Sequence, residues 1–149
     1  MKVKFKKLIP AAKIPTKATP GSAAYDLYAI ESVSITPGVT VSVRTGLSIE
    51  IPEGWKGEIY SRSGLAYVGV VVSNSPGKID SDYRGEIKVL LYNNGSCNSC
   101  RAKPAATLIK SGDRIAQFEI NPVHDIEFEE IEELSKSERG SGGFGSTGK

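Results

Sequence analysis

The sequence predicts an all-β domain, a jelly-roll-like β-barrel, on three observations. Apolar residues alternate with polar ones in short stretches, so that each predicted strand has one apolar face. Turn signals rich in proline, glycine and asparagine separate these stretches. Helical spacing is absent apart from one short helical turn, which the pattern favours at residues 63–67. Short strands divided by turns in this way are typical of β-sandwiches and barrels.

The predicted strands follow from the period-two pattern along the chain. The N-terminal segment alternates lysines with Val3 and Phe5 and leads into no apolar core, so we expect a strand and not a signal peptide. Further alternating sets predict strands around Val33 and Ile35, Val39 to Val43, Leu47 to Ile51, and Ile87 to Leu91. Residues 125–133 carry six acidic side chains, but Ile126 and Phe128 still alternate with them. We therefore expect a final half-exposed strand there in preference to an acidic interaction surface.

Composition limits the classes of protein to which the chain can belong. A chain of 149 residues is expected to form one domain, and a net charge of +2 gives no electrostatic footprint for duplex nucleic acid. No apolar stretch approaches the roughly 20 residues of a membrane-spanning helix. We expect a soluble, cytoplasmic protein that has neither nucleic acid nor a membrane as its partner.

Cys97 and Cys100 form a single C-x-x-C in a polar segment, residues 96–106, which we expect to be an extended surface loop. One such pair supplies only two ligands, and the one histidine, His124, is distant in sequence. Unpaired loop thiols are the favoured interpretation, ahead of a disulfide or redox pair and of a structural zinc site.

The composition of residues 137–149 predicts a flexible tail. We expect this tail to follow a catalytic β-barrel domain of residues 1–136. Half of the ten residues 140–149 are glycine, so the segment cannot pack a core. It combines glycine N–H groups with hydroxyl and cationic side chains suited to phosphates, namely Arg139, Ser141, Ser146, Thr147 and Lys149. Its aromatic residue, Phe144, can stack on a nucleobase. The tail is therefore predicted to be a lid over a bound nucleotide.

Residues 143–149 also have the pattern G-x-x-x-x-G-K of a phosphate-binding P-loop. A P-loop needs a strand before it and a helix after it. No helix follows here, so we do not expect a P-loop nucleotidase.

Four internal segments have compositions that core packing does not explain. Residues 22–27 place Asp26 among small and apolar residues, where a structural hydrogen-bond acceptor is the competing interpretation. Residues 62–66, Arg-Ser-Gly-Leu-Ala, join an arginine and a hydroxyl at a helix start, which suits an anion. Residues 112–117 bring Gln117 into a predicted strand, either facing a ligand or beside a strand ion pair.

The fourth segment, residues 74–86, is the richest in chemistry. Pro76 and Gly77 predict a tight hairpin whose backbone groups can bind the edge of a base. Asp80 follows, and a carboxylate near a bound phosphate can orient and deprotonate a water molecule. A polar surface hairpin is the alternative.

Taken in order, residues 23–27, 62–66, 74–86, 112–117 and 139–148 resemble the five motifs of the homotrimeric dUTPase family. The resemblance spans about residues 7–149. It implies hydrolysis of dUTP to dUMP and pyrophosphate, which limits uracil incorporation into DNA and supplies dUMP for dTMP synthesis. It also implies a homotrimer with shared active sites, and Mg²⁺ held by substrate phosphates and water with no protein ligand.

The same resemblance implies a role for each matching residue. Asp80 would be the general base that activates the attacking water. Tyr83 would lie against the deoxyribose, where a ribose 2′-hydroxyl would clash. The uracil would be bound without room for a thymine methyl by hairpin residues, namely Asn74, Gly77 and Ile79.

The remaining roles concern the phosphates and the lid. Phosphate contacts would come from Arg62, Ser63 and Gly64, Gln117 would order the α-phosphate region, and Asp26 would support the site. In the tail, the terminal phosphate and the base would be covered by Arg139, Phe144, Gly145, Ser146 and Thr147.

Small departures from the family pattern leave these roles in place. Lys78 occupies a commonly apolar or small position, and the 96–106 loop is longer than usual. Two alternatives remain open at this point. One is a deaminase of the same fold that acts on the base of dCTP, and the other is a regulatory protein that uses dUTP occupancy as a signal.

Overall fold

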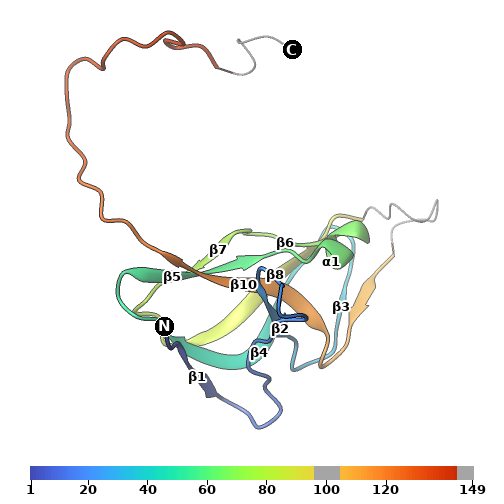
Figure 1. Ribbon diagram of the computed structural model, residues 1–149. Helices are drawn as coiled ribbons and strands as arrows, with labels where there is room; N and C mark the ends of the chain where they lie inside the picture. Colours follow the sequence, from blue (N-terminus) through green and yellow to red (C-terminus); the bar gives the residue numbers. More distant parts are fainter. Residues whose placement is uncertain (96–104, 144–149) are drawn as a thin grey trace.

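A computed structural model of the chain describes residues 1–95 and 105–143 (Figure 1). In these residues the chain forms ten strands and one short helix. Their bounds are β1 Lys4–Lys7, β2 Tyr25–Tyr28, β3 Val33–Ile35, β4 Thr40–Glu50, β5 Trp55–Tyr60, α1 Ser63–Tyr67, β6 Val70–Val72, β7 Gly77–Ile79, β8 Glu86–Asn93, β9 Thr107–Ile109 and β10 Arg114–Pro122. The all-β prediction and the helical turn at residues 63–67 are confirmed.

The strands form two four-stranded sheets and one two-stranded sheet, all antiparallel. One large sheet has the order β1-β4-β8-β6, the other β2-β10-β5-β7, and β3 pairs with β9. The apolar face of each strand points into one shared core, to which β8 contributes the alternating residues Ile87, Val89 and Leu91, each at most 1% exposed. The architecture is jelly-roll-like, with two facing sheets that remain separate in their hydrogen bonding.

The segment after β10, residues 123–143, is named the C-terminal arm. It leaves the barrel after a hydrogen bond from the Val123 backbone N–H to the Gly54 carbonyl at 2.8 Å and runs away from both sheets (Figure 1). The predicted strand around residues 125–133 is wrong, because this segment pairs with no strand among residues 1–95 and 105–143. Ile126 and Phe128 are 70% and 90% exposed. Their alternation is real, but nothing in the described part of this single chain covers them.

Two further expectations can be compared with the structure only in part. In the described ranges, no helix has the length and apolar character needed to cross a membrane. Cys97 and Cys100 lie outside the described residues, as does most of the 96–106 loop.

Candidate active site

The hairpin that joins β7 to β8 borders a cavity of about 460 Å³, named here the hairpin cavity. Its lining residues are Ser42, Asn74, Lys78, Ile79, Asp80, Tyr83, Glu86, Lys88 and Leu90. A cavity of this size falls in the range typical of small-molecule sites. The structure therefore gathers four of the residues predicted for base, sugar and water, namely Asn74, Ile79, Asp80 and Tyr83.

Asp80 follows the last residue of β7 and is exposed. Its backbone carbonyl accepts a hydrogen bond from the Tyr83 N–H at 3.2 Å, which closes the turn. Its carboxylate has no hydrogen bond or ion pair to any residue in the described part of the chain. The Asp80 carboxylate thus lies at the cavity without a partner among the described residues.

Gly77 lies close to the side chain of Asn74 within the hairpin. Gly77 is buried, and a Cβ atom there would approach the Asn74 Nδ2 atom to 3.0 Å. The Asn74 amide therefore packs against the bare Cα of Gly77 and is held at the cavity wall. The Ser75–Pro76 peptide bond between them is cis.

A second set of predicted residues gathers around Asp26, which is 5% exposed on β2. Asp26 Oδ1 lies 3.2 Å from Arg62 Nε, and Asp26 Oδ2 lies 3.2 Å from Arg114 Nη1. Arg62 Nη1 also donates a hydrogen bond to the Arg114 carbonyl at 3.0 Å. Gln117 lies directly opposite Asp26 in the β2–β10 ladder. We name these four residues the Asp26 cluster.

The Asp26 cluster is a pair of oriented guanidinium groups fixed by one buried carboxylate. Ser63 and Gly64 begin α1 directly after Arg62, and both are exposed. None of these residues lines the hairpin cavity. Within one chain, the predicted phosphate-binding groups therefore form a site separate from the predicted base, sugar and water groups.

Glu58 is a buried carboxylate next to the hairpin cavity, bound to the lining residue Lys78, and the sequence analysis missed it. Glu58 is 6% exposed on β5, directly across from Lys78 of β7. Its carboxylate accepts hydrogen bonds from Lys78 Nζ, from Tyr60 Oη at 2.8 Å and from Asn121 Nδ2 at 2.6 Å. The Lys78 ammonium, followed by the Tyr60 hydroxyl, lowers the pKa of Glu58 to about 2. The carboxylate is therefore ionised at neutral pH and fastens the strand that leads into Asp80.

The described part of the tail lies on the arm, away from the barrel (Figure 1). Arg139 Nε donates to the Gly142 carbonyl at 3.0 Å, and the Gly142 N–H donates back to the Arg139 carbonyl at 3.1 Å. The structure thus does not bring Arg139 to either predicted site within the same chain. The predicted lid residues Phe144, Gly145, Ser146 and Thr147 lie outside the described residues.

Comparison with known proteins gives a consistent result. The model of the dUTPase family matches residues 11–148. The deoxyuridine 5′-triphosphate nucleotidohydrolase of Nautilia profundicola is 51% identical over 150 residues, covering 100% of both chains. The structure of the Staphylococcus bacteriophage 80alpha dUTPase with dUPNHPP superposes with a TM-score of 0.86 at 30% identity, covering 99% of this chain and 98% of the other.

A third similar structure is that of a mutant dUTPase from phage phi11 of S. aureus, which shows the coordination of a structural Mg(II) ion. It superposes with a TM-score of 0.77 at 25% identity, covering 90% of this chain and 99% of the other.

Proposed function

Because the chain belongs to the dUTPase family and hydrolyses dUTP to dUMP, we propose that its hairpin cavity holds the nucleoside and the catalytic base. The observation that carries this proposal is the convergence of Asn74, Ile79, Asp80 and Tyr83 on one cavity of about 460 Å³. The cavity offers a carboxylate, an amide and an aromatic ring within one hairpin. These are the groups needed to activate water, bind a base edge and contact a sugar.

In this proposal Asp80 is the general base. A water bound to its carboxylate attacks the α-phosphorus of dUTP, a new O–P bond forms, and the bond from that phosphorus to the bridging oxygen breaks. Asp80 takes the proton of the water, and pyrophosphate leaves with the electron pair of the broken bond. The absence of any competing partner for the Asp80 carboxylate in the described residues supports this role.

Uracil and deoxyribose occupy the rest of the cavity. Asn74 and the backbone around Gly77 and Ile79 bind the uracil edge and leave no room for a thymine methyl. Tyr83 packs against the deoxyribose at the position where a ribose would carry its 2′-hydroxyl. The 42% exposure of Tyr83 leaves part of the ring open to such a contact.

The triphosphate is bound by a different set of groups. Arg62, with Ser63 and Gly64 at the start of α1, contacts phosphate oxygens, and Gln117 orders the α-phosphate region. Asp26 repels a phosphate by charge, so its part is to orient the Arg62 and Arg114 guanidinium groups. Arg139 with the tail residues Phe144, Gly145, Ser146 and Thr147 covers the terminal phosphate and the base, so residues 137–149 act as a tail on a catalytic domain of residues 1–136.

We propose that these two sets of groups meet in a homotrimer whose active sites are shared between copies. The separation of the Asp26 cluster from the hairpin cavity in one chain supports this arrangement. The arm supports it as well, because an extended segment with exposed Ile126 and Phe128 requires a surface outside its own barrel.

A suitable surface for the arm lies along β1. This edge strand borders a groove of about 510 Å³ lined mainly by apolar residues, among them Val3, Phe5 and Ile14. An exposed strand edge can bind an extended segment of another copy through backbone hydrogen bonds. The lysines of the N-terminal segment complement the six acidic residues at positions 125–133. A trimer has three times the 15.9 kDa mass of the chain, which light scattering in solution measures.

Mg²⁺ would be held by the phosphates of the substrate and by water molecules. In residues 1–95 and 105–143, no group of three or more histidine, cysteine or acidic side chains is arranged to hold a metal ion. Magnesium commonly binds through substrate phosphates and water molecules. We propose that Mg²⁺ would come bound to the triphosphate and would lower its negative charge, and we assign no residue of this chain as its ligand.

The cellular role follows from the substrate. Removing dUTP limits uracil incorporation into DNA, and the product dUMP supplies dTMP synthesis. Because deoxynucleotides of this pool are cytoplasmic, we place the enzyme there, and measurement of the activity in separated cell fractions tests that placement.

Mixing two defective variants tests whether the active sites are shared. Asp80→Asn removes the base, and deletion of residues 139–149 removes the lid, so each variant alone is expected to be nearly inactive. When the two chains are co-expressed and assemble at random, a site that combines Asp80 of one copy with the tail of another is intact in roughly a quarter of cases. We expect about that fraction of wild-type activity in the purified mixture. A mixture no more active than its two components, despite verified mixed assembly, would show that each site is built from one chain.

A further inference from the structure

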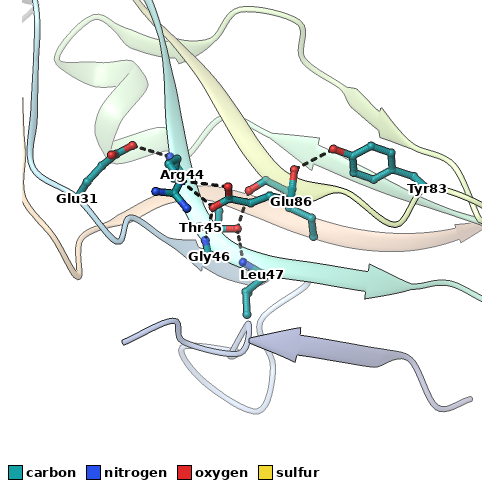
Figure 2. A network of polar contacts seen from close by, with 8 residues as sticks. Glu31, Arg44, Thr45, Gly46, Leu47, Tyr83 and Glu86 are labelled. Carbon is teal, nitrogen blue, oxygen red and sulfur yellow. Dashed lines mark hydrogen bonds and ion pairs between the residues drawn. The ribbon is translucent and has the colours of Figure 1, made fainter. Parts of the chain in front are cut away.

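The ring of Tyr83 is held in place by Glu86, the first residue of β8, and by Gly85 just before it. Tyr83 Oη donates a hydrogen bond to the Glu86 backbone carbonyl at 2.9 Å (Figure 2). The phenol end of the ring lies directly over Gly85. An exposed tyrosine would otherwise rotate freely at the surface. These contacts fix the position of the one aromatic ring in the hairpin cavity.

Gly85 is the residue that leaves space for the ring. A Cβ atom on Gly85 would lie 2.4 Å from Tyr83 Oη, 2.6 Å from Cζ and 2.9 Å from Cε2. Real Cβ atoms do not approach other heavy atoms this closely, so any larger residue displaces the ring. The backbone of Gly85 is not in the left-handed region. Glycine is required here for the space and not for the backbone angle.

Glu86, whose carbonyl receives the tyrosine hydroxyl, is itself held firmly in the sheet. Its carboxylate lies 3.0 Å from Arg44 Nε and accepts the Gly46 backbone N–H at 2.9 Å (Figure 2). These partners lie in β4 where the register against β8 shifts, and Gly46 there has a φ of +67°. Next to this point, Thr45 Oγ1 donates to the buried Ile87 carbonyl at 2.6 Å. The acceptor of the tyrosine hydroxyl is therefore part of the rigid barrel.

From this geometry we infer that Gly85 is a positioning residue for sugar specificity, because it allows the Tyr83 ring to lie where it excludes a ribose. The inference rests on the proposed contact between Tyr83 and the deoxyribose. With any side chain at position 85, the Tyr83 ring must move and its hydrogen bond to the Glu86 carbonyl is lost. Space for a hydroxyl group then opens beside C2′ of the sugar. Tyr83 is the group that gives way, because it is half exposed while the barrel behind Gly85 is fixed.

The test compares kcat/KM for dUTP with kcat/KM for UTP. We expect Gly85→Ala to lower the dUTP-to-UTP ratio by about tenfold or more, the scale on which a misfitted group is discriminated. The melting temperature is expected to stay within about 2 °C of wild type, as for a surface substitution. Gly21→Ala is the matched control, because a Cβ atom at Gly21 has nothing within 4 Å and the Gly21 backbone is not left-handed.

Variants of Tyr83 separate the inference from the function on which it rests. Tyr83→Ala is expected to lower the ratio, and adding Gly85→Ala to it should then change nothing further, because the displaced ring is gone. Tyr83→Phe leaves the backbone untouched, loses the hydrogen bond to Glu86 and is expected to lower the ratio by roughly threefold. If Tyr83→Ala lowers the ratio while Gly85→Ala and Tyr83→Phe do not, the inference about Gly85 is wrong and the sugar contact stands. If Tyr83→Ala keeps the wild-type ratio, the sugar contact itself is wrong, and the inference fails with it.

Discussion

Replacing Asp80 by asparagine is expected to lower kcat for dUTP by about 10²- to 10⁴-fold, the usual contribution of a general base. Asparagine keeps the shape of the side chain but cannot accept the proton of the attacking water. Binding of dUTP should change by only a few-fold, because base, sugar and phosphates have other partners. Steady-state kinetics gives kcat, and calorimetry with a non-hydrolysable dUTP analogue gives the binding constant.

Asp82→Asn provides the matched control for Asp80. Asp82 is an exposed aspartate in the same hairpin, but it does not line the hairpin cavity. The same chemical change at Asp82 is expected to leave kcat within about twofold of wild type, as for a surface substitution. A nearly wild-type kcat for Asp80→Asn, or an equal loss in both variants, would refute the assignment of Asp80 as the base.

Deletion of residues 139–149 is expected to lower kcat/KM for dUTP by about 10²-fold or more. Stacking on one base contributes roughly 1–3 kcal/mol, and the deletion also removes the Arg139 charge and the hydroxyl groups of the tail. Part of the binding free energy from stacking offsets the conformational entropy that the glycine-rich tail loses when it becomes ordered over the nucleotide.

The stability of the truncated protein separates a lid from a structural segment. Arg139 and Gly142 hydrogen-bond to each other on the exposed arm. The melting temperature without nucleotide should therefore be unchanged, and the assembly should keep its mass. Scanning calorimetry and light scattering measure both quantities. A large drop in the melting temperature of the unliganded protein would mean that the tail is part of the folded body.

The sequence predicted those strands whose pattern is set by one buried face. Ile87, Val89 and Leu91 alternate with polar residues because β8 has the core on one side, and this strand was predicted correctly. The two strands expected at residues 39–43 and 47–51 form one continuous strand, β4, whose register against β8 shifts between Arg44 and Ser48. The same pattern at Ile126 and Phe128 predicted a strand that the single chain does not form. Alternating apolar and polar residues indicate that one face of an extended segment packs against other residues. They do not indicate whether those residues belong to the same copy of the chain or to another copy.

The candidate site could be predicted where several polar and ionisable residues lie within one short segment. The hairpin of residues 74–86 was identified from its turn residues and acids, and Asp80 and Tyr83 do line one cavity. Glu58 was missed, because a glutamate in a short strand is ordinarily placed on the solvent side. Its burial depends on Lys78 and Asn121, which lie on two other strands. No local pattern marks such a contact.

The space above Gly85 is a second feature that the sequence does not reveal. Glycine in a hairpin suggests a turn that needs a left-handed backbone, yet here the backbone is ordinary and the ring of Tyr83 fills the space. Likewise, Arg44 and Glu86 are 42 residues apart in the chain. Only the folded register of β4 against β8 brings them together.

Release of pyrophosphate from dUTP, dTTP, dCTP and UTP, measured in parallel with magnesium present, tests the central claim most directly. We expect dUTP to yield one dUMP for each pyrophosphate, at a rate at least about 10²-fold above the other three nucleotides. Thymine carries an extra methyl, cytosine presents a different base edge, and UTP carries a 2′-hydroxyl that would clash with Tyr83 in the proposed site. Comparable rates with dTTP or UTP, or release of ammonia from dCTP, would contradict a site built to hydrolyse dUTP.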